Sequence, residues 1–246
     1  MAKQRVDVLL TLRGLAPTRA RAQALVLAGR VYVEERRVDK AGALLPEDTP
    51  LTVREGDHPY VSRGGVKLAG ALDAFALDVR GARCLDVGAS TGGFTDCLLQ
   101  RGAARVVAVD VGYGQLAQKL RDDPRVVNLE RTNARDLDPE AIGGPADVVV
   151  VDASFIGIGK LAAALFANAK PGGALVALIK PQFEVGREAA ARGKGVVRDE
   201  ALRRAAIDEA RRELEAAGWE VLGEADPTLA GPKGNLEAFV WCRKPA

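Results

Sequence analysis

The sequence predicts an α/β fold, in which a doubly wound and mostly parallel sheet follows a small α+β domain. Two observations support this prediction. Apolar runs of strand length alternate with helical patterns from about residue 83 onward, which is typical of parallel strands with helices on both faces of the sheet. The first 56 residues instead suggest two short helices and a few very short strands, and they are too few to belong to a second sheet of that kind.

Length and charge indicate a large domain joined to a small basic one. The chain has 246 residues, of which 48% are hydrophobic, so it can bury an ordinary globular core. The net charge is only +2, but the segment through Arg37 has eight Lys and Arg against three Asp and Glu. That segment therefore carries +5 and the remainder −3. A basic piece on a mildly acidic body suggests a polyanion-binding module attached to a catalytic domain.

Cysteine and histidine usage excludes several classes of site. Cys84, Cys97 and Cys242 lack the Cys-x-x-Cys spacing, and His58 is the only histidine, which argues against zinc sites and histidine-based triads. We expect the cysteines to be small buried residues in a reducing compartment. No signal-peptide pattern opens the sequence, and no apolar run approaches the roughly 20 residues of a spanning helix. We therefore expect a cytoplasmic protein without a metal site.

The amino-terminal segment predicts a compact module. Apolar residues at helical spacing predict a first helix over residues 5–15, and a second helix should begin at Pro17-Thr18 and end at Gly29. Residues 31–33 and 51–53 alternate like short strands. The turn-rich residues 56–59 mark a boundary. We place the first domain at 1–56, a linker at 57–62 and the second domain at 63–246.

Residues 18–33 carry a recognisable pattern. From Thr18 to Val33 the chain resembles the αL RNA-binding motif of a small-subunit ribosomal protein, which pseudouridine synthases and tyrosyl-tRNA synthetases also carry. The pattern departs after Val33, where Glu34-Glu35 stands in place of the usual Asn-Gly. The resemblance implies that this domain binds RNA, and guanidinium groups suit phosphate oxygens. The basic residues expected at the RNA are Lys3, Arg5, Arg19 and Arg21; a merely solvated basic face is the alternative.

The second domain should begin with a helix and continue as alternating strands and helices. Ser62 can cap a helix whose Leu68, Leu72 and Phe75 form an apolar stripe, with Lys67 off that stripe. Strands are expected at 83–87, 106–110, 126–129, 148–151, 174–179, 219–224 and 236–242, and helices at 94–101, 115–121, 161–169 and 199–217. The last two strands have no helix between them and should form an antiparallel edge.

The first strand of this domain leads into a glycine-rich turn. Such a turn at the carboxyl end of a parallel strand lets bare backbone approach a ligand. Asp110 ends the next strand, 24 residues after Asp86, where a ribose-binding carboxylate is expected. A dinucleotide fingerprint would need glycine at Ser90, and Asp86 would repel a phosphate but suit an amino-bearing ligand. The pattern favours S-adenosylmethionine over a nicotinamide cofactor; a turn that only packs strand on helix is the alternative.

Charged residues follow several strands of the predicted sheet. Asp110, Asp136, Asp152 and Lys180 lie at or just beyond strand ends, so we expect them on one rim, where ligands bind in such sheets. A lysine buried beside Asp152 requires a paired, hydrogen-bonded site. Lys67 from the helix and Glu237 from the last strand could complete a Lys-Asp-Lys-Glu cluster.

With Lys67, Asp152, Lys180 and Glu237 in this order, the second domain resembles the FtsJ-type ribose 2′-O-methyltransferases. Further motifs are Ser-Arg-Gly-Gly-Val-Lys at 62–67, the stretch 86–96, Asp-Ala-Ser-Phe at 152–155 and Ile-Lys-Pro-Gln-Phe-Glu at 179–184. Together with the αL domain, they make the whole chain similar to the TlyA family. These are ribosomal RNA cytidine 2′-O-methyltransferases, sometimes labelled haemolysins. The resemblance implies a Rossmann-like class I methyltransferase sheet, S-adenosylmethionine as cofactor, and cytidines of 16S and 23S RNA as substrates, with some members of the family modifying only the large-subunit RNA.

The residues suggest how such an enzyme would work. A ribose 2′-hydroxyl is a poor nucleophile at neutral pH, and a lysine serves as its base only when burial or a nearby cation favours the neutral amine. We assign Lys180 as the base. Asp152 and Glu237 would hold the lysines, while Lys67 would orient the hydroxyl and stabilise developing negative charge.

The expected contacts extend these roles along the rim. For the cofactor they are Asp86, Gly88, Ala89, Ser90, Thr91, Gly92, Gly93, Phe94, Asp110, Val111, Asp136, Asp152 and Phe155, with Asp110 at the ribose, Asp136 at the adenine amino group and Phe155 near the methyl donor. Arg63, Arg131, Arg135 and Arg187 would add phosphate contacts. We expect a monomer that acts on ribosomal RNA or ribosomal subunits and needs no metal. The alternatives are a membrane-active haemolysin and a non-catalytic RNA-binding ribosome-assembly factor.

Overall fold

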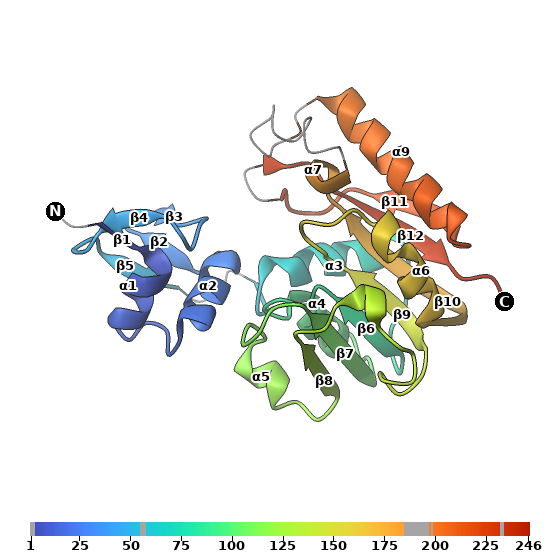
Figure 1. The fold of residues 1–246 in the computed structure, drawn as a ribbon, viewed down its shortest axis with the longest axis horizontal. Helices are drawn as coiled ribbons and strands as arrows, with labels where there is room; N and C mark the ends of the chain where they lie inside the picture. The colour runs from blue at the N-terminus through green and yellow to red at the C-terminus, as the bar shows by residue number, and fades with distance from the viewer. Residues whose placement is uncertain (1–2, 55–57, 185–196, 198, 232–233) are drawn as a thin grey trace.

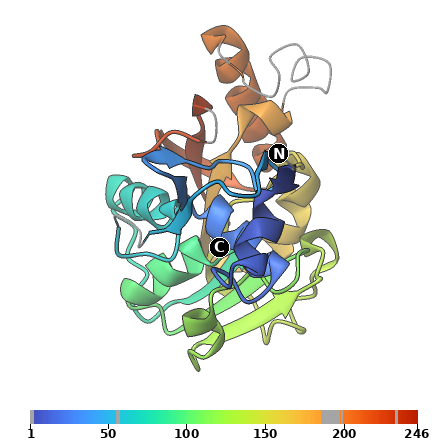
Figure 2. The same ribbon diagram turned by 90° about the vertical axis from the view of Figure 1, so that its left-hand side faces the viewer.

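The structure, a computed structural model, describes residues 3–54, 58–184, 197, 199–231 and 234–246. Figure 1 shows two lobes, a small amino-terminal domain and a larger domain built on one central sheet. The small domain lies beside the start of helix α3 (Arg63–Ala74) and the short helix α5 (Gln118–Arg121), and Figure 2 shows it in front of the larger domain.

The small domain contains two helices and two small antiparallel sheets in its described part. Its elements are β1 (Lys3–Arg5), α1 (Val6–Leu12), α2 (Arg19–Leu27), β2 (Val31–Val33), β3 (Arg36–Arg37), β4 (Leu44–Pro46) and β5 (Leu51–Val53). Strand β2 pairs with β3 and β5, and β1 pairs with β4. The predicted helices and the strands 31–33 and 51–53 are confirmed, and strands β1, β3 and β4 were not predicted.

Local chemistry explains the ends of these helices. Helix α2 begins after Thr18, whose side-chain oxygen accepts a hydrogen bond from the backbone N–H of Arg21 at 3.1 Å. Helix α1 is shorter than the predicted 5–15, because Arg5 belongs to a strand at its start and the helix ends at Leu12, two residues before Gly14 at φ 69°. The two-residue turn from β2 to β3 forms despite the missing Asn-Gly, with Glu34 in the left-handed region at φ 53°.

The larger domain has a seven-stranded sheet in the order β11-β12-β10-β9-β6-β7-β8. Its strands are β6 (Arg83–Val87), β7 (Arg105–Asp110), β8 (Val126–Glu130), β9 (Ala146–Val151), β10 (Ala169–Ile179), β11 (Glu220–Ala225) and β12 (Ala238–Arg243). The pairs from β10 through β8 are parallel, and β12 runs antiparallel to both β10 and β11. The predicted class, a mostly parallel Rossmann-like sheet with an antiparallel edge, is confirmed.

Helices cover both faces of this sheet, as Figures 1 and 2 show. The helices besides α3 and α5 are α4 (Gly93–Gln100), the 3-10 turn η1 (Ala134–Asp136), α6 (Gly159–Ala167), α7 (Pro181–Glu184) and α9 (Glu200–Ala216). Alternate strand residues face opposite sides: Leu85 packs in the cluster of α6 and α9, whereas Cys84 packs in that of α3 and α4. All three cysteines are buried and free, as expected.

Several boundaries differ from the sequence prediction for identifiable reasons. Strand β10 starts at Ala169 rather than 174, with a register shift before Ala174 that accommodates the Pro-Gly-Gly segment. Helix α5 has only four residues. Strand β12 begins at Ala238, so Glu237 lies just before the strand and not on it. Ser62 does occupy the N-cap of α3, but its side chain makes no capping hydrogen bond.

Candidate active site

The glycine turn between β6 and α4 is held in a conformation that excludes larger residues. Gly88 has φ 83°, and a Cβ at that position would lie 2.8 Å from the backbone oxygen of Asp152. Gly92 has φ 92°, and Ser90 also has a positive φ of 48°. A non-glycine residue in such a conformation costs of order 1–3 kcal/mol and is characteristic of ligand sites. Glycine at these positions therefore lets the turn pack closely against the end of β9 and against Leu116 and Leu120, at the carboxyl end of β6.

Asp86 lies beneath the turn and is fully buried. The hydroxyl of Thr95 donates to its Oδ2 at 2.6 Å, while its Oδ1 is buried and has no hydrogen-bond partner among the described residues. Burial, reinforced by the charge of Asp152, raises the pKa of Asp86 to about 7. An unsatisfied carboxylate oxygen in this position fits a ligand that carries an amino group, as S-adenosylmethionine does.

Asp110 closes the other side of the turn at the end of β7. Its Oδ2 accepts from the backbone N–H of Ser90 at 2.8 Å, and its Oδ1 accepts from the N–H of Gly112 at 2.6 Å. These bonds fix the carboxylate beside the turn, where its remaining lone pairs can accept from ribose hydroxyls. The neighbouring Val111 is 73% exposed.

Two lysine–carboxylate pairs lie on the same rim of the sheet. The Nζ atom of Lys180 is 2.6 Å from Oδ1 of Asp152, and it also donates to the hydroxyl of Ser154 at 2.9 Å. The Nζ atom of Lys67 is 2.5 Å from Oε2 of Glu237. Both members of the second pair are buried, although neither was assigned to the core from the sequence.

Strand pairing places one member of each pair, Lys180 and Glu237, at the same end of two neighbouring strands. In the antiparallel ladder of β10 and β12, Ile179 faces Ala238, so the following residue, Lys180, is directed toward Glu237 at the end of the ladder. Asp152 follows β9, and its backbone N–H donates to the carbonyl of Val87 on β6 at 3.0 Å. The sheet thus places Asp152, Lys180 and Glu237 at the end where the glycine turn lies, and Lys67 of α3 reaches Glu237 through their ion pair.

Lys180 also contacts Ser154, a residue to which the sequence analysis assigned no functional role. Ser154 belongs to the quoted Asp-Ala-Ser-Phe motif, but no role was given to its hydroxyl. Its position two residues beyond Asp152 was the available signal, because both side chains reach the same ammonium group. Phe155, the next residue, is 90% exposed at φ 68°, and its ring lies 5.3 Å from that of Phe183.

Several predicted cofactor contacts lie on the segments that follow strands β6, β8 and β9. Asp136 lies exposed in η1, after β8. Thr91, Gly93 and Phe94 are buried where the turn enters α4, and Ala89 is buried within the turn. The assignment of these residues, and of Phe155, to the cofactor stays a prediction.

The arginines predicted to contact RNA differ in their surroundings. The side chains of Arg5 and Arg19 both pair with the buried Asp7, at 2.9 and 3.0 Å, which fixes them side by side. Arg21 lies between the lobes. The other candidates are Lys3, which is exposed, Arg63, whose guanidinium donates to the carbonyl of Ala230, Arg131, stacked on Tyr113, and the exposed Arg135. Arg187 lies outside the described residues.

Neither a metal cluster nor a membrane-spanning helix is found in the described part of the chain. No group of three or more His, Cys, Asp or Glu residues described by the structure is placed to hold a metal ion. None of the described helices is long and apolar enough to cross a bilayer.

The pKa of Asp86 predicts a pH-dependent affinity for S-adenosylmethionine. An amino group pairs with the ionised carboxylate, so affinity should fall by up to about tenfold per pH unit below about pH 7. The stability of the unliganded protein should change with pH in the opposite direction. Because the pKa of Asp86 is raised on folding, the free energy of unfolding should decrease as pH rises from about 4 to about 7. Calorimetric titrations between pH 6 and 8 measure the affinity. Asp86→Asn should bind more weakly at pH 8 and lose this dependence; an unchanged pH profile in that variant would contradict the assignment.

The chain matches two protein families, several curated relatives and solved structures. Residues 60–244 match the FtsJ-like methyltransferase family, and residues 4–49 match the S4 domain. The 16S/23S rRNA (cytidine-2′-O)-methyltransferase TlyA of Mycobacterium tuberculosis is 50% identical over 98% of this chain and 90% of its own length. Hemolysin A of Brachyspira hyodysenteriae is 39% identical over 95% of this chain and 97% of its own. A solved structure from Streptococcus thermophilus, described as a candidate hemolysin, is 40% identical with a TM-score of 0.77, covering 100% of this chain and 90% of its own.

Proposed function

The chain belongs to the TlyA family of FtsJ-like methyltransferases, and from that premise we propose that it methylates the ribose 2′-hydroxyl of cytidine in ribosomal RNA. The observation that supports this most directly is the rim at which two lysine–carboxylate pairs adjoin the glycine turn. A site for 2′-O-methylation needs a base for the hydroxyl and a place for the methyl donor, and the rim offers both.

The donor that fits the turn is S-adenosylmethionine. Asp86, with its unpartnered oxygen, would hold the amino group of the methionine part, and Asp110 would accept from the ribose hydroxyls. The glycines at 88 and 92 let the turn between these two carboxylates pack closely, Gly88 against the backbone of Asp152 and Gly92 against the side chains of Leu116 and Leu120. When bound, the cofactor supplies a methyl group on a sulfonium, which needs a correctly placed nucleophile more than further activation.

The lysines would prepare that nucleophile. Lys180, held by Asp152 and Ser154, accepts the proton of the 2′-hydroxyl in its neutral form. Lys67, fixed by Glu237, places a positive charge where the oxygen becomes negative. Because both lysine side chains are held in place by short contacts to carboxylates, little reorganisation is needed when the hydroxyl arrives.

The two parts of the chain would divide the work. We propose an RNA-binding domain at 1–56, a linker at 57–62 and a methyltransferase domain at 63–246. Arg5 and Arg19, both anchored on Asp7, present guanidinium groups of the first domain to the RNA backbone.

Methyl mapping tests the proposal. Ribosomal RNA from cells that lack this protein should accept tritiated methyl groups from S-adenosylmethionine when purified protein is added, at cytidine 2′-oxygens in 16S RNA, 23S RNA or both. RNA from cells that contain the protein serves as the control, since its sites are already filled. Label on bases only, or no difference between the two RNAs, would contradict the proposal.

A further inference from the structure

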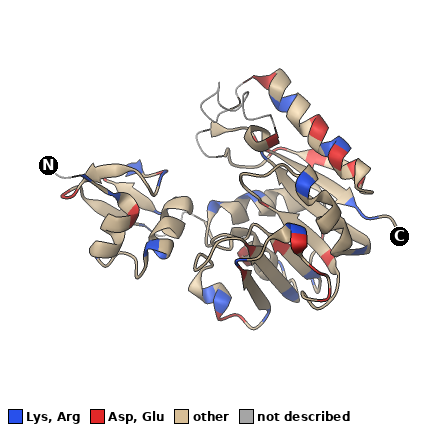
Figure 3. Cartoon of the chain, in the orientation of Figure 1, with Lys and Arg blue, Asp and Glu red and all other residues tan. Residues whose placement is uncertain are grey.

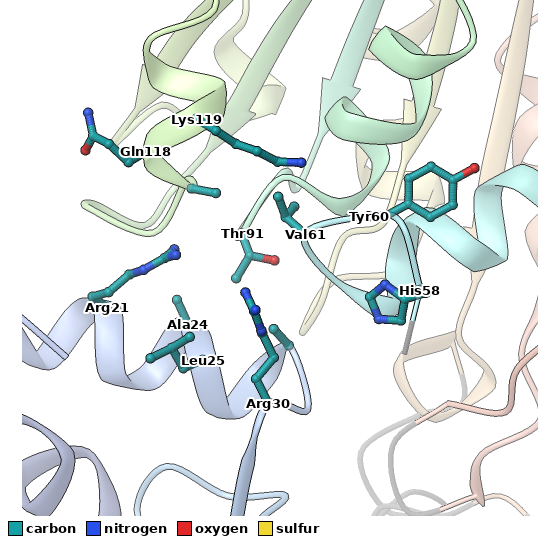
Figure 4. Close-up of a pocket in the computed structure, with 12 residues that line it drawn as sticks. Arg21, Ala24, Leu25, Arg30, His58, Tyr60, Val61, Thr91, Gln118 and Lys119 are labelled. Carbon is teal, nitrogen blue, oxygen red and sulfur yellow. The ribbon is translucent and has the colours of Figure 1, made fainter. Parts of the chain in front are cut away.

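A pocket of about 360 Å³ lies between the two lobes, on the side of the glycine turn that faces the small domain. We call it the interdomain pocket. Its polar lining includes Arg21 and Arg30 from the small domain and His58, Thr91 and Lys119 from the other side. In Figure 4, Arg21 and Arg30 extend toward Thr91, and Lys119 reaches in from the opposite side.

The positive charges in this pocket are poorly compensated. Among the residues that the structure describes, neither Arg21 nor Arg30 has a carboxylate partner; the guanidinium of Arg30 donates to the carbonyl oxygen of Arg54 at 3.1 Å. Lys119 pairs with Asp96 at 2.9 Å, yet its side chain remains 54% exposed. The Nδ1 atom of His58 is buried without a hydrogen-bond partner in the same described part. The pocket therefore contains donors and cations in excess of acceptors.

The cations of the two lobes also act on one another. Burial lowers the pKa of the Arg21 guanidinium, and the charges of Arg30 and Arg121 lower it further. Arg121 belongs to α5 of the larger domain, so this repulsion crosses the interface between the lobes. In Figure 3, Lys and Arg lie on α2 and on α5, the helices that flank this interface. An interface that served only to pack two domains would be more stable without such a cluster.

We propose that the interdomain pocket binds a phosphodiester group of the RNA substrate, with Arg21 and Arg30 as ligands from one lobe and Lys119 from the other. This rests on the proposed function, because it assumes an RNA substrate. A guanidinium presents paired N–H donors that match two phosphate oxygens, and a phosphate would neutralise charges that now repel each other. A phosphate held by both lobes would also fix the small domain against the glycine turn.

The salt dependence of RNA binding tests this directly. We compare the affinity of the full-length chain for ribosomal RNA between 50 and 300 mM KCl, in Arg21→Gln, Arg21→Lys and the unchanged chain. Each phosphate neutralised contributes about 0.7–0.9 to the slope of log affinity against log salt. Arg21→Gln should lose about that much, whereas Arg21→Lys, which keeps the charge, should retain it. Arg212→Gln is the matched control, because its exposed side chain pairs with Glu209 on the same helix, α9.

Other readouts separate this role from a structural one. Without RNA, Arg21→Gln should unfold at the same temperature as the unchanged chain or higher, since it removes a repulsive charge; a lower midpoint would overturn the proposal. Calorimetric titration with inorganic phosphate should show weak binding that Arg21→Gln abolishes. If phosphate binds but the RNA slope stays unchanged, the pocket serves a free anion and the proposal is wrong.

The failure of this inference differs from that of the proposed function. If the unchanged chain transfers no methyl group to ribosomal RNA, the proposed function fails. If it does transfer methyl groups and Arg21→Gln shows the same salt slope as the unchanged chain, only the phosphate site is refuted.

Discussion

Replacing Lys180 with alanine is expected to reduce methyl transfer to ribosomal RNA by roughly 10²–10⁴-fold, the range associated with a general base. The affinity for S-adenosylmethionine should change little, because the groups expected at the cofactor, Asp86 and Asp110, lie on β6 and β7. Single-turnover transfer of a tritiated methyl group measures the first quantity, and calorimetric titration measures the second. The contrast between a large loss of rate and a preserved affinity is what identifies a residue that acts on the acceptor.

A conservative variant distinguishes a base from a fixed charge. Lys180→Arg keeps a cation beside Asp152 but cannot accept a proton near neutral pH, because an arginine side chain remains charged. If Lys180 is the base, the arginine variant should be as inactive as the alanine variant. Substantial activity in Lys180→Arg would instead assign an electrostatic role to this position. Lys170→Ala is the control. Lys170 pairs with Asp147 and lies near the start of the same strand, β10, at the end opposite to Lys180.

Replacing Glu237 with alanine is expected to lower both stability and activity. The pair that it forms with Lys67 is buried on both sides, so the substitution leaves an ammonium group in the core without its carboxylate. Breaking such a pair by removing one partner costs about 3–5 kcal/mol. Urea denaturation measures the loss as a lower midpoint, and the methyl-transfer assay at a temperature where the variant is folded measures the effect on the rate.

A double variant separates these two effects. Glu237→Met combined with Lys67→Met removes both charges and leaves apolar side chains, so most of the lost stability should return. Methyl transfer should not return, because the cation proposed to stabilise the 2′-oxygen is gone. Recovery of both properties would show that the buried pair is only structural, and recovery of neither would mean that the methionines do not fit the space.

The sequence predicted the sheet well because its signals are local. Runs such as Val148–Val151 have a period and length that identify a buried parallel strand, and glycines mark the turn at 88–93. Because the carboxyl ends of parallel strands share one rim, the neighbourhood of Asp152 and Lys180 followed from the strand pattern, whereas Glu237 was added only as a residue that could complete the cluster. In the structure Lys180 pairs with Asp152 and Lys67 pairs with Glu237, while the catalytic role of the four residues stays a prediction.

The features that the sequence did not reveal depend on contacts between distant segments. Strand β1 forms because Lys3–Arg5 pairs with β4, and a segment of three residues is too short to show a periodicity that would predict this pairing. The burial of Lys67 depends on Glu237, 170 positions later. The interdomain pocket forms where α2 lies beside α5. The sequence of neither helix predicts that the two lie together.

The position of β12 has a consequence for biosynthesis. This strand is inserted between β10 and β11, and its Phe239, Val240 and Cys242 are fully buried. During translation the ribosome releases β10 and β11 first, and they lie apart until β12 emerges between them. The carboxylate that anchors Lys67 immediately precedes that strand. An incompletely translated chain therefore lacks both the strand that joins β10 to β11 and the carboxylate that pairs with Lys67.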